Sequence, residues 1–146
     1  MRNNHIGAYI KSIGLVCEWN FNRDLKEFNL TSVQLSIVRY LVEHKDEVIH
    51  QKDIENEFGL KNSTVSGILK RLEAKEYLKR ETGIDDSRYK LITIKEKGLA
   101  LNQELKRRTD AFEAKLLKNF SDDEKNHLID YLIRIYNNAR GDDKND

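Results

Sequence analysis

The stretch from Asn62 to Gly98 decides the fold: NSTVSGILKRLEAKEYLKRETGIDDSRYKLITIKEKG. Its first part has apolar residues at the spacing of one helix face, namely Val65, Ile68, Leu69 and Leu72. Two basic segments follow, and a tip of turn-forming residues lies between them. The stretch therefore predicts a helix that ends near Lys75 and a hairpin with strands at residues 77–81 and 88–94.

A shorter helix is predicted directly before this stretch. Lys52–Phe58 carries apolar residues on one face, and Gly59 can end the helix because glycine readily takes the left-handed conformation found there. Asn62 is expected to cap the second helix. Two helices joined by residues 59–61 have the spacing of a helix-turn-helix. Helix, turn, helix and hairpin in this order predict a winged helix.

The remaining sequence predicts helices on both sides of the winged helix. Apolar spacing indicates a helix over residues 6–28, and a capping box from Thr31 to Gln34 starts another that ends near His44. After the hairpin we expect a long helix through Leu99 and Leu117, then a final helix that begins at the capping box Ser121–Glu124. The fold class is therefore mostly α with a minor β part.

The final predicted helix has a wide apolar face. Leu128, Leu132 and Ile135 form one stripe, and Ile129, Ile133 and Tyr136 form a second stripe beside it. One stripe would suffice to pack the helix within its own chain, so we expect the second to face another subunit. The alternative is a helix buried deep in one subunit. A chain with 38% hydrophobic and 35% charged residues builds a thin core, which favours the partner subunit.

Composition excludes several classes of protein. The 146 residues have a formal net charge of +1, so overall charge implies no anionic partner. Lys61 to Lys97 nevertheless carry ten basic and six acidic residues, which makes this part the candidate for anion binding or, alternatively, a solvated surface. No run approaches the roughly 18 apolar residues of a membrane span, and we expect no signal peptide. One cysteine, Cys17, excludes an internal disulfide and fits the cytoplasm.

Small and polar residues mark the start of the helix at residue 62. A helix that enters a DNA major groove must bring its first turns close to base edges, and bulky side chains would hold it away. The free amides of a helix start can also bind phosphate. The alternative is an ordinary helix start, which is often small and polar. The candidate DNA contacts on this helix are Asn62, Ser63, Thr64, Ser66, Gly67 and Lys70.

The predicted hairpin supplies a second set of candidate contacts. Arg88 follows a tip long enough to reach a minor groove, whose negative potential attracts arginine. Asp86 is placed to hold that guanidinium in one orientation, although an exposed pair by itself contributes under about 1 kcal/mol. Lys79, Arg80 and Lys90 on the strands are expected to meet flanking phosphates.

Together, these motifs resemble the winged helix of the MarR family of bacterial transcription regulators. The family's pattern of Leu, two residues, a small residue, Thr, an apolar residue and Ser or Thr is matched from Leu60 to Ser66. Its Leu-x-Arg-Leu-Glu motif is matched at residues 69–73. Its Asp-x-Arg wing signature falls on Asp86 and Arg88. The resemblance covers nearly the whole chain.

Three positions depart from the family's pattern. Glu76 stands where glycine is usual, so a left-handed turn there costs more. Lys95 replaces a threonine that caps the helix after the wing, and Thr93 with Glu96 offers a substitute capping box. His50 opens the short helix where a better cap is common. These departures affect local geometry and leave the candidate DNA contacts in place.

The resemblance implies a homodimer that binds double-stranded DNA at a pseudo-palindromic operator, with repression as the expected effect. Residues 1–30 and 99–140 would form the N- and C-terminal dimerisation helices, residues 31–98 the DNA-binding domain, and residues 141–146 a disordered tail. Many family members release DNA when a small, often aromatic, ligand binds between these parts. Candidate ligand residues are Tyr9, Trp19, Phe21, Tyr40 and His44, with plain core aromatics as the alternative.

Other functions find less support in the sequence. Cys17 lies deep in the first predicted helix, where a buried inert thiol is favoured over an oxidant sensor. The four histidines show no paired spacing typical of zinc ligands, so we expect no metal and no cofactor. No phosphate-binding loop or nucleophile motif indicates an enzyme. A winged helix used for protein contact remains the main alternative, and it predicts an apolar exposed face on the helix at residue 62.

Overall fold

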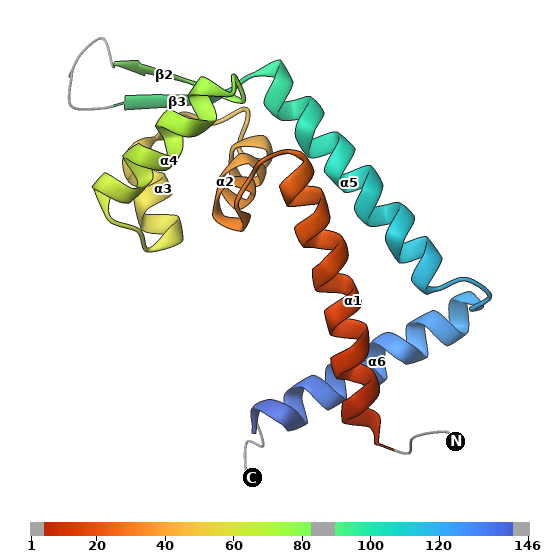
Figure 1. The fold of residues 1–146 in the computed structure, drawn as a ribbon. Helices are drawn as coiled ribbons and strands as arrows, with labels where there is room; N and C mark the ends of the chain where they lie inside the picture. The colour runs from red at the N-terminus through yellow and green to blue at the C-terminus, as the bar shows by residue number, and fades with distance from the viewer. Residues whose placement is uncertain (1–4, 83–89, 142–146) are drawn as a thin grey trace. The chain divides into compact units, whose positions relative to one another are not determined.

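The computed structural model describes residues 5–82 and 90–141 (Figure 1). Its helices are α1 Ile6–Glu27, α2 Ser32–Glu43, α3 Gln51–Phe58, α4 Asn62–Ala74, α5 Glu96–Leu116 and α6 Asp122–Arg140. Its strands are β1 Ile49–His50, β2 Leu78–Thr82 and β3 Lys90–Ile94. The predicted order of helix, turn, helix and hairpin is therefore confirmed. The chain divides into two compact units, Met1–Leu105 and Lys106–Asp146.

The capping box at Thr31 forms as predicted and starts α2. Thr31 Oγ1 accepts a hydrogen bond from the Gln34 amide at 3.2 Å, and Gln34 Oε1 accepts one from the Thr31 amide at 3.0 Å. Leu35, Val38 and Leu41 on the inner face of α2 are buried, while Val42 is only half-buried. Ile37, which the apolar pattern did not single out, is also fully buried.

The turn between α3 and α4 follows from one glycine. Gly59 has φ 60°, and the Leu60 amide donates to the Glu55 carbonyl at 3.0 Å, which closes the end of α3. The predicted cap of α4 is wrong by one residue. Lys61 occupies the N-cap position without a side-chain bond, and Asn62 is the first helical residue. The side chain of Asn62 is bonded to Glu55 instead.

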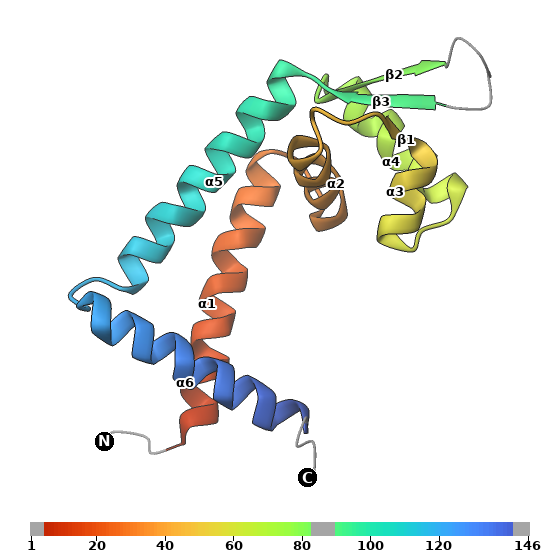
Figure 2. The same cartoon turned by 180° about the vertical axis from the view of Figure 1, so that it is seen from behind.

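The sheet has the order β1-β3-β2, and both pairings are antiparallel (Figure 2). Leu78 pairs with Ile94 and Ile49 pairs with Ile92, so the short β1 extends the hairpin. Glu76, between α4 and β2, has φ 63°. The left-handed turn predicted from the family's glycine is therefore present, and a non-glycine residue holds it at a cost of roughly 1–2 kcal/mol.

The entry into α5 needs Gly98 for steric reasons. A Cβ atom at Gly98 would overlap the Tyr77 carbonyl oxygen and the Ile94 side chain. The Lys95 amide donates to that same carbonyl at 2.9 Å, which fixes β3 against the segment before β2. The substitute capping box predicted at Thr93 is wrong, because Thr93 lies within β3 and pairs with Lys79.

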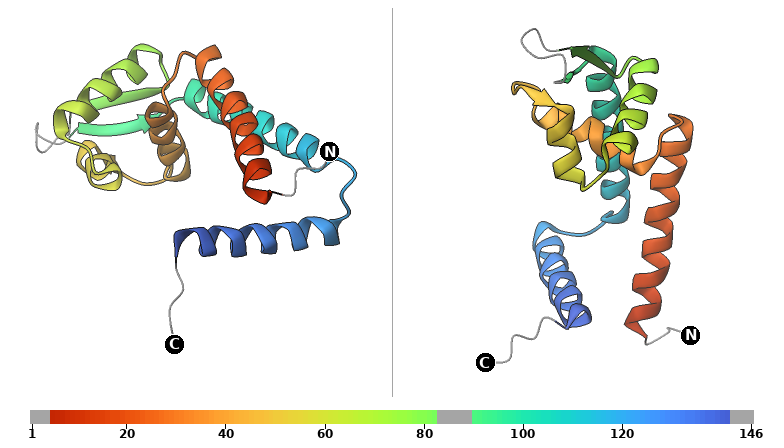
Figure 3. Two further views of the ribbon diagram at one scale, coloured as in Figure 1. Left: turned by 60° about the horizontal axis from the view of Figure 1, so that its bottom comes forward. Right: turned by 90° about the vertical axis from the view of Figure 1, so that its left-hand side faces the viewer.

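The core lies within Met1–Leu105 and joins α2, α3, α4 and the sheet with the ends of α1 and α5. Figure 3 shows α4 lying along the hairpin strands. The residues that the sequence placed on the inner face of α4 are buried in this core, namely Val65, Ile68, Leu69 and Leu72. Burial of four such side chains fixes which face of α4 remains outside.

Two long helices stay largely uncovered within the single chain. Leu25 is the buried residue of α1, and no residue of α6 is buried. On α6, Ile129, Leu132, Ile133 and Tyr136 are each about half exposed or more. The contact of α6 with another subunit and the alternative of burial within one subunit both stay predictions. Over residues 5–82 and 90–141, no helix is both long and apolar enough to span a bilayer.

The aromatic residues of α1 are also exposed. Tyr9, Trp19 and Phe21 expose 49%, 63% and 40% of their surface. Their role as ligand residues and the alternative of core aromatics both stay predictions. Cys17 is half-buried, so the expectation of a buried thiol is not met in the single chain.

Candidate nucleic-acid interface

Helix α4 presents a polar face to solvent. Ser63, Thr64 and Lys70 are exposed, while Ser66 and Gly67 are half-buried beside them. A Cβ atom added at Gly67 would meet no heavy atom within 4 Å in the part of the chain that is described. Packing within the chain therefore does not require glycine at this position. The open space agrees with a position where a glycine allows a partner to approach closely.

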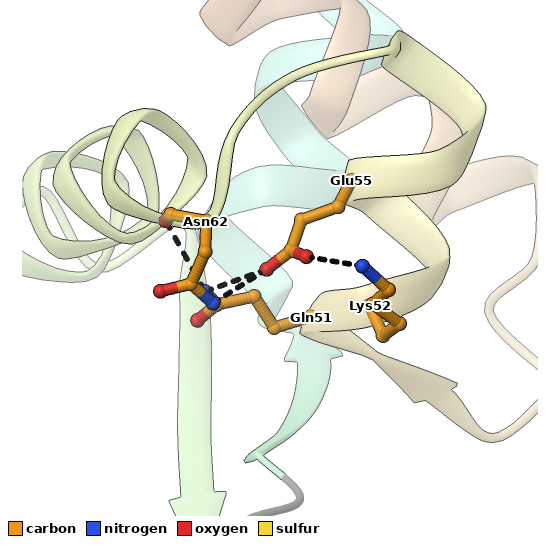
Figure 4. A network of polar contacts seen from close by, with 4 residues as sticks. All are labelled: Gln51, Lys52, Glu55 and Asn62. Carbon is orange, nitrogen blue, oxygen red and sulfur yellow. Dashed lines mark hydrogen bonds and ion pairs between the residues drawn. The ribbon is translucent and has the colours of Figure 1, made fainter.

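A buried carboxylate lies behind the first turn of α4 (Figure 4). Glu55, which exposes 7% of its side chain, receives a 2.6 Å hydrogen bond from Asn62 Nδ2 and a 3.2 Å bond from Gln51 Nε2 at the same oxygen, Oε1. Its other oxygen accepts a 3.1 Å bond from Lys52 Nζ. Gln51 Nε2 also donates to the Asn62 carbonyl at 3.5 Å. This network links α3 directly to the start of α4.

These donors determine the ionisation of Glu55. The hydrogen bond from Lys52 lowers the pKa of the Glu55 carboxyl, burial raises it, and the bonds from Asn62 and Gln51 lower it further. The net effect is a pKa below the ordinary value, so Glu55 is ionised at neutral pH. Glu55 was not among the site residues predicted from the sequence. A charged residue at a position of α3 that faces α4 was the available signal.

Two basic residues of β2 are occupied by carboxylates. The Arg80 amide donates a 2.9 Å hydrogen bond to Glu73 Oε1, and Arg80 Nε donates one of 2.8 Å to Glu73 Oε2. Arg80 Nη2 also forms an ion pair of 2.7 Å with Glu73 Oε2. Lys79 forms an ion pair with Glu81. The side chain of Arg80 exposes only 20% of its surface. Because Glu73 lies on α4, these contacts tie the hairpin to α4. This geometry does not favour the predicted role of Arg80 as a phosphate contact.

The same contacts act on Glu73. Burial raises the pKa of its carboxyl, but the side-chain and backbone hydrogen bonds of Arg80 and the charges of Arg80 and Lys90 outweigh that effect and lower it. Lys90 is exposed at the start of β3, so its position agrees with the predicted contact to DNA. Asp86 and Arg88, the predicted wing-tip contacts, lie outside the described residues.

The structure brings two of the five predicted ligand residues together. The ring of Tyr40 on α2 lies 4.4 Å from the ring of His44 at the C-cap of that helix, and Phe58 of α3 meets Tyr40 edge-on at 5.9 Å. The other three predicted ligand residues are on α1, where the guanidinium carbon of Arg23 lies over the Trp19 ring, 5.2 Å from its centroid.

A surface cavity of about 500 Å³ lies elsewhere, between the start of α2 and the end of α4. It is lined by Asn29, Leu30, Thr31, Gln34, Arg71, Ala74 and Lys75, and by none of the five predicted ligand residues. Groups of three or more metal-binding side chains do not occur in the described ranges.

Comparison with known proteins identifies the family. The family model described as "MarR family" matches residues 28–88. An uncharacterized HTH-type transcriptional regulator of Bacillus subtilis, YdgJ, is 32% identical over 98 residues. That match covers 67% of this chain and 59% of the relative, so it spans less than two thirds of that protein's length.

The chain belongs to the MarR family. A solved structure assigned to this family, from Clostridium acetobutylicum, is 29% identical with a TM-score of 0.77 and covers 90% of this chain and 96% of that one. The S. aureus MepR–DNA complex has a TM-score of 0.82 at 23% identity, with coverage of 91% and 98%, and shows the same fold. The family resemblance inferred from the motifs and the winged-helix fold class are therefore both confirmed.

Proposed function

We propose that this MarR family chain is a transcription regulator that binds double-stranded DNA in a sequence-specific manner. One observation carries the proposal: α4 buries its apolar face in the core and exposes a face of small polar residues with Lys70. A helix held in this way can enter a major groove with its first turns near base edges. MepR, which shares the fold, has been solved with DNA, and the relatives of this chain are named as transcriptional regulators.

The active form is proposed to be a homodimer. Helices α1 and α6 each expose a row of large apolar side chains, and these rows are wide enough that a monomer in water would expose much apolar surface. A second copy of the chain supplies the same apolar faces in return. Two recognition helices would then meet successive major grooves, and the operator would be pseudo-palindromic.

Repression is the proposed effect, because a dimer bound across a promoter obstructs transcription. A small aromatic effector is proposed to release the dimer, and Tyr40 with His44 is the part of the predicted ligand set that the structure brings together. S. aureus MepR has been solved with ethidium bromide. We expect no cofactor, no catalytic activity and a cytoplasmic location.

The alternative is a winged helix that binds another protein. It predicts an apolar exposed face on α4, whereas most of the exposed residues there are polar or charged, Ser63, Thr64 and Lys70 among them. The polar face therefore favours DNA.

Selection from a random-sequence duplex library tests the proposal. The purified chain is expected to enrich one motif with two inverted half-sites about one helical turn apart. Enrichment of no motif, while the chain is folded and dimeric, would contradict the proposed function. Enrichment of a single half-site would contradict the dimeric arrangement alone.

A further inference from the structure

We propose that Glu55 is a positioning residue that sets the base preference of Asn62, by holding the Asn62 amide with its oxygen directed outward. Asn62 would then select a base that presents an amino group in the major groove, adenine or cytosine. This inference rests on the proposed function and names one determinant of its specificity.

The chemistry of Glu55 fixes the orientation of Asn62. An ionised carboxylate only accepts hydrogen bonds, so the atom of Asn62 that lies 2.6 Å from Glu55 Oε1 must be the amide nitrogen. The flipped amide would place two oxygen atoms at that distance. Figure 4 shows the amide oxygen of Asn62 directed away from Glu55. An amide that is normally ambiguous therefore has one orientation here.

Several hydrogen bonds restrain this orientation. Glu55 is buried and is bonded at both oxygens, and Gln51 fastens the backbone of Asn62 through its carbonyl. Asn62 itself stands exposed on the first turn of α4, the turn that meets base edges in a helix-turn-helix. A side chain ordered before binding loses less entropy when it binds.

A contribution to the stability of the fold does not by itself explain why this network is present. The buried Gln51 Oε1 has no hydrogen-bond partner among the described residues, and a buried polar network that is only partly satisfied stabilises less than an apolar core. A buried carboxylate is also costly to desolvate. What the network does provide is a fixed direction for one amide at the DNA-facing turn.

The outward oxygen restricts the partner of Asn62. Phosphate oxygens are acceptors, so they do not pair with an amide oxygen. Adenine N6 and cytosine N4 are the amino donors of the major groove, and adenine N7 can accept the second N–H of the amide. Without Glu55 the amide can flip, and guanine and thymine become equally acceptable.

A double-mutant cycle tests the inference on the duplex that the wild-type chain selects from the random library. The measured quantity is the ratio of the Kd for scrambled DNA to the Kd for the selected duplex. Glu55→Ala and Asn62→Ala should each lower this ratio about fivefold to tenfold, and the double variant should lie no lower than Asn62→Ala alone. A repeated selection with Glu55→Ala should lose the adenine or cytosine preference at one position of each half-site.

The matched control is Glu57→Ala, which removes an exposed carboxylate from the same helix. It tightens binding to every DNA through charge alone and should leave the ratio unchanged. If Glu55→Ala does not fold, Glu55→Met keeps the side-chain volume and takes its place in the cycle.

Additive losses in the cycle, or an unchanged base preference in Glu55→Ala, would overturn the inference while leaving the proposed function intact. A wild-type chain that selects no sequence would instead overturn the proposed function, and the inference with it.

Discussion

Helices α4 and α6 are both amphipathic, but only α4 has apolar residues that are buried. In α4 the apolar face is buried in the core and the polar face is exposed. In α6 no residue is buried, and the stripe of Ile129, Ile133 and Tyr136 is exposed, whereas Leu128 and Ile135 are half-buried. The chemical character of the exposed face of each helix indicates the kind of partner that it binds. The outer face of α4 suits a polar, charged partner such as DNA, and α6 suits a second apolar face.

The largest effect is expected at α6. Leu132→Asp places a carboxylate in the proposed subunit interface, where an unpaired buried charge costs about 3–5 kcal/mol. Because Leu132 is not part of the core of this chain, the monomer should still melt cooperatively. Light scattering after gel filtration is expected to give the monomer mass. The control is Asn126→Asp, an exposed position of the same helix, and a variant Leu132→Asp that remains dimeric would contradict the assignment of α6.

The next largest effect is expected on the outer face of α4. Ser66→Leu adds bulk where the helix must meet base edges, so affinity for the selected duplex should fall by about 100-fold or more. Ser36→Leu makes the same change on an exposed face of α2 and should bind normally. Fluorescence anisotropy measures both. Full site-specific affinity in Ser66→Leu would show that α4 is not the recognition helix.

Arg88→Ala tests the wing predicted from the sequence. Loss of one arginine from a minor groove is expected to cost about 1–3 kcal/mol of DNA binding without changing the dimer. Arg39→Ala removes an exposed arginine from α2 and serves as the control for net charge. Equal affinities for the operator in wild type and Arg88→Ala would refute the wing contact.

Gly67→Ala should change thermal stability and DNA affinity in opposite directions. The added methyl group meets open space in the chain, and alanine favours the helix by up to about 1 kcal/mol, so thermal stability should rise. The same methyl group lies where DNA would approach, so operator affinity should fall several-fold. Gly14→Ala in α1 also adds a methyl group in open space and should raise stability alone. Unchanged DNA affinity in Gly67→Ala would refute close approach at this position.

The smallest effect concerns the attachment of the hairpin to α4. The pKa of Glu73 is lowered in the folded chain, so its pairing with Arg80 stabilises the fold above the ordinary carboxyl pKa of about 4.3 and loses this effect as pH falls through the lowered value. Glu73→Gln should therefore lose about 1 kcal/mol at pH 7 and less at an acidic pH below the lowered value. Thermal melts at the two pH values measure this difference, with Glu113→Gln as the exposed control. An equal loss at both pH values would show that the ion pair is not the cause.

The sequence predicted what depends on local patterns. The capping boxes at Thr31 and Ser121, the left-handed Gly59 and the buried face of α4 all follow from residue types a few positions apart, and all are present. Glu76 was identified as a strained turn from a missing glycine alone, and its φ is positive.

What depends on contacts between elements was not predicted. Asn62 was expected to cap its own helix, but a buried carboxylate from α3 competes for its side chain, and no pattern within α4 contains that information. Arg80 was expected to bind phosphate, but its guanidinium is hydrogen-bonded to Glu73, which lies seven residues earlier on a different element. Thr93 was expected to cap α5, but pairing with β2 draws it into the sheet.

Recognition of DNA sequence by the outer face of α4 is tested by an anisotropy titration with the DNA upstream of this chain's own gene. It is run at several salt concentrations against a scrambled duplex of the same composition. We expect a Kd that is at least 1,000-fold lower for the specific duplex at about physiological salt, a steep salt slope for both duplexes, and loss of the difference in Ser66→Leu. If wild type and Ser66→Leu distinguish the two duplexes equally well, sequence recognition does not reside in α4 and the claim is contradicted.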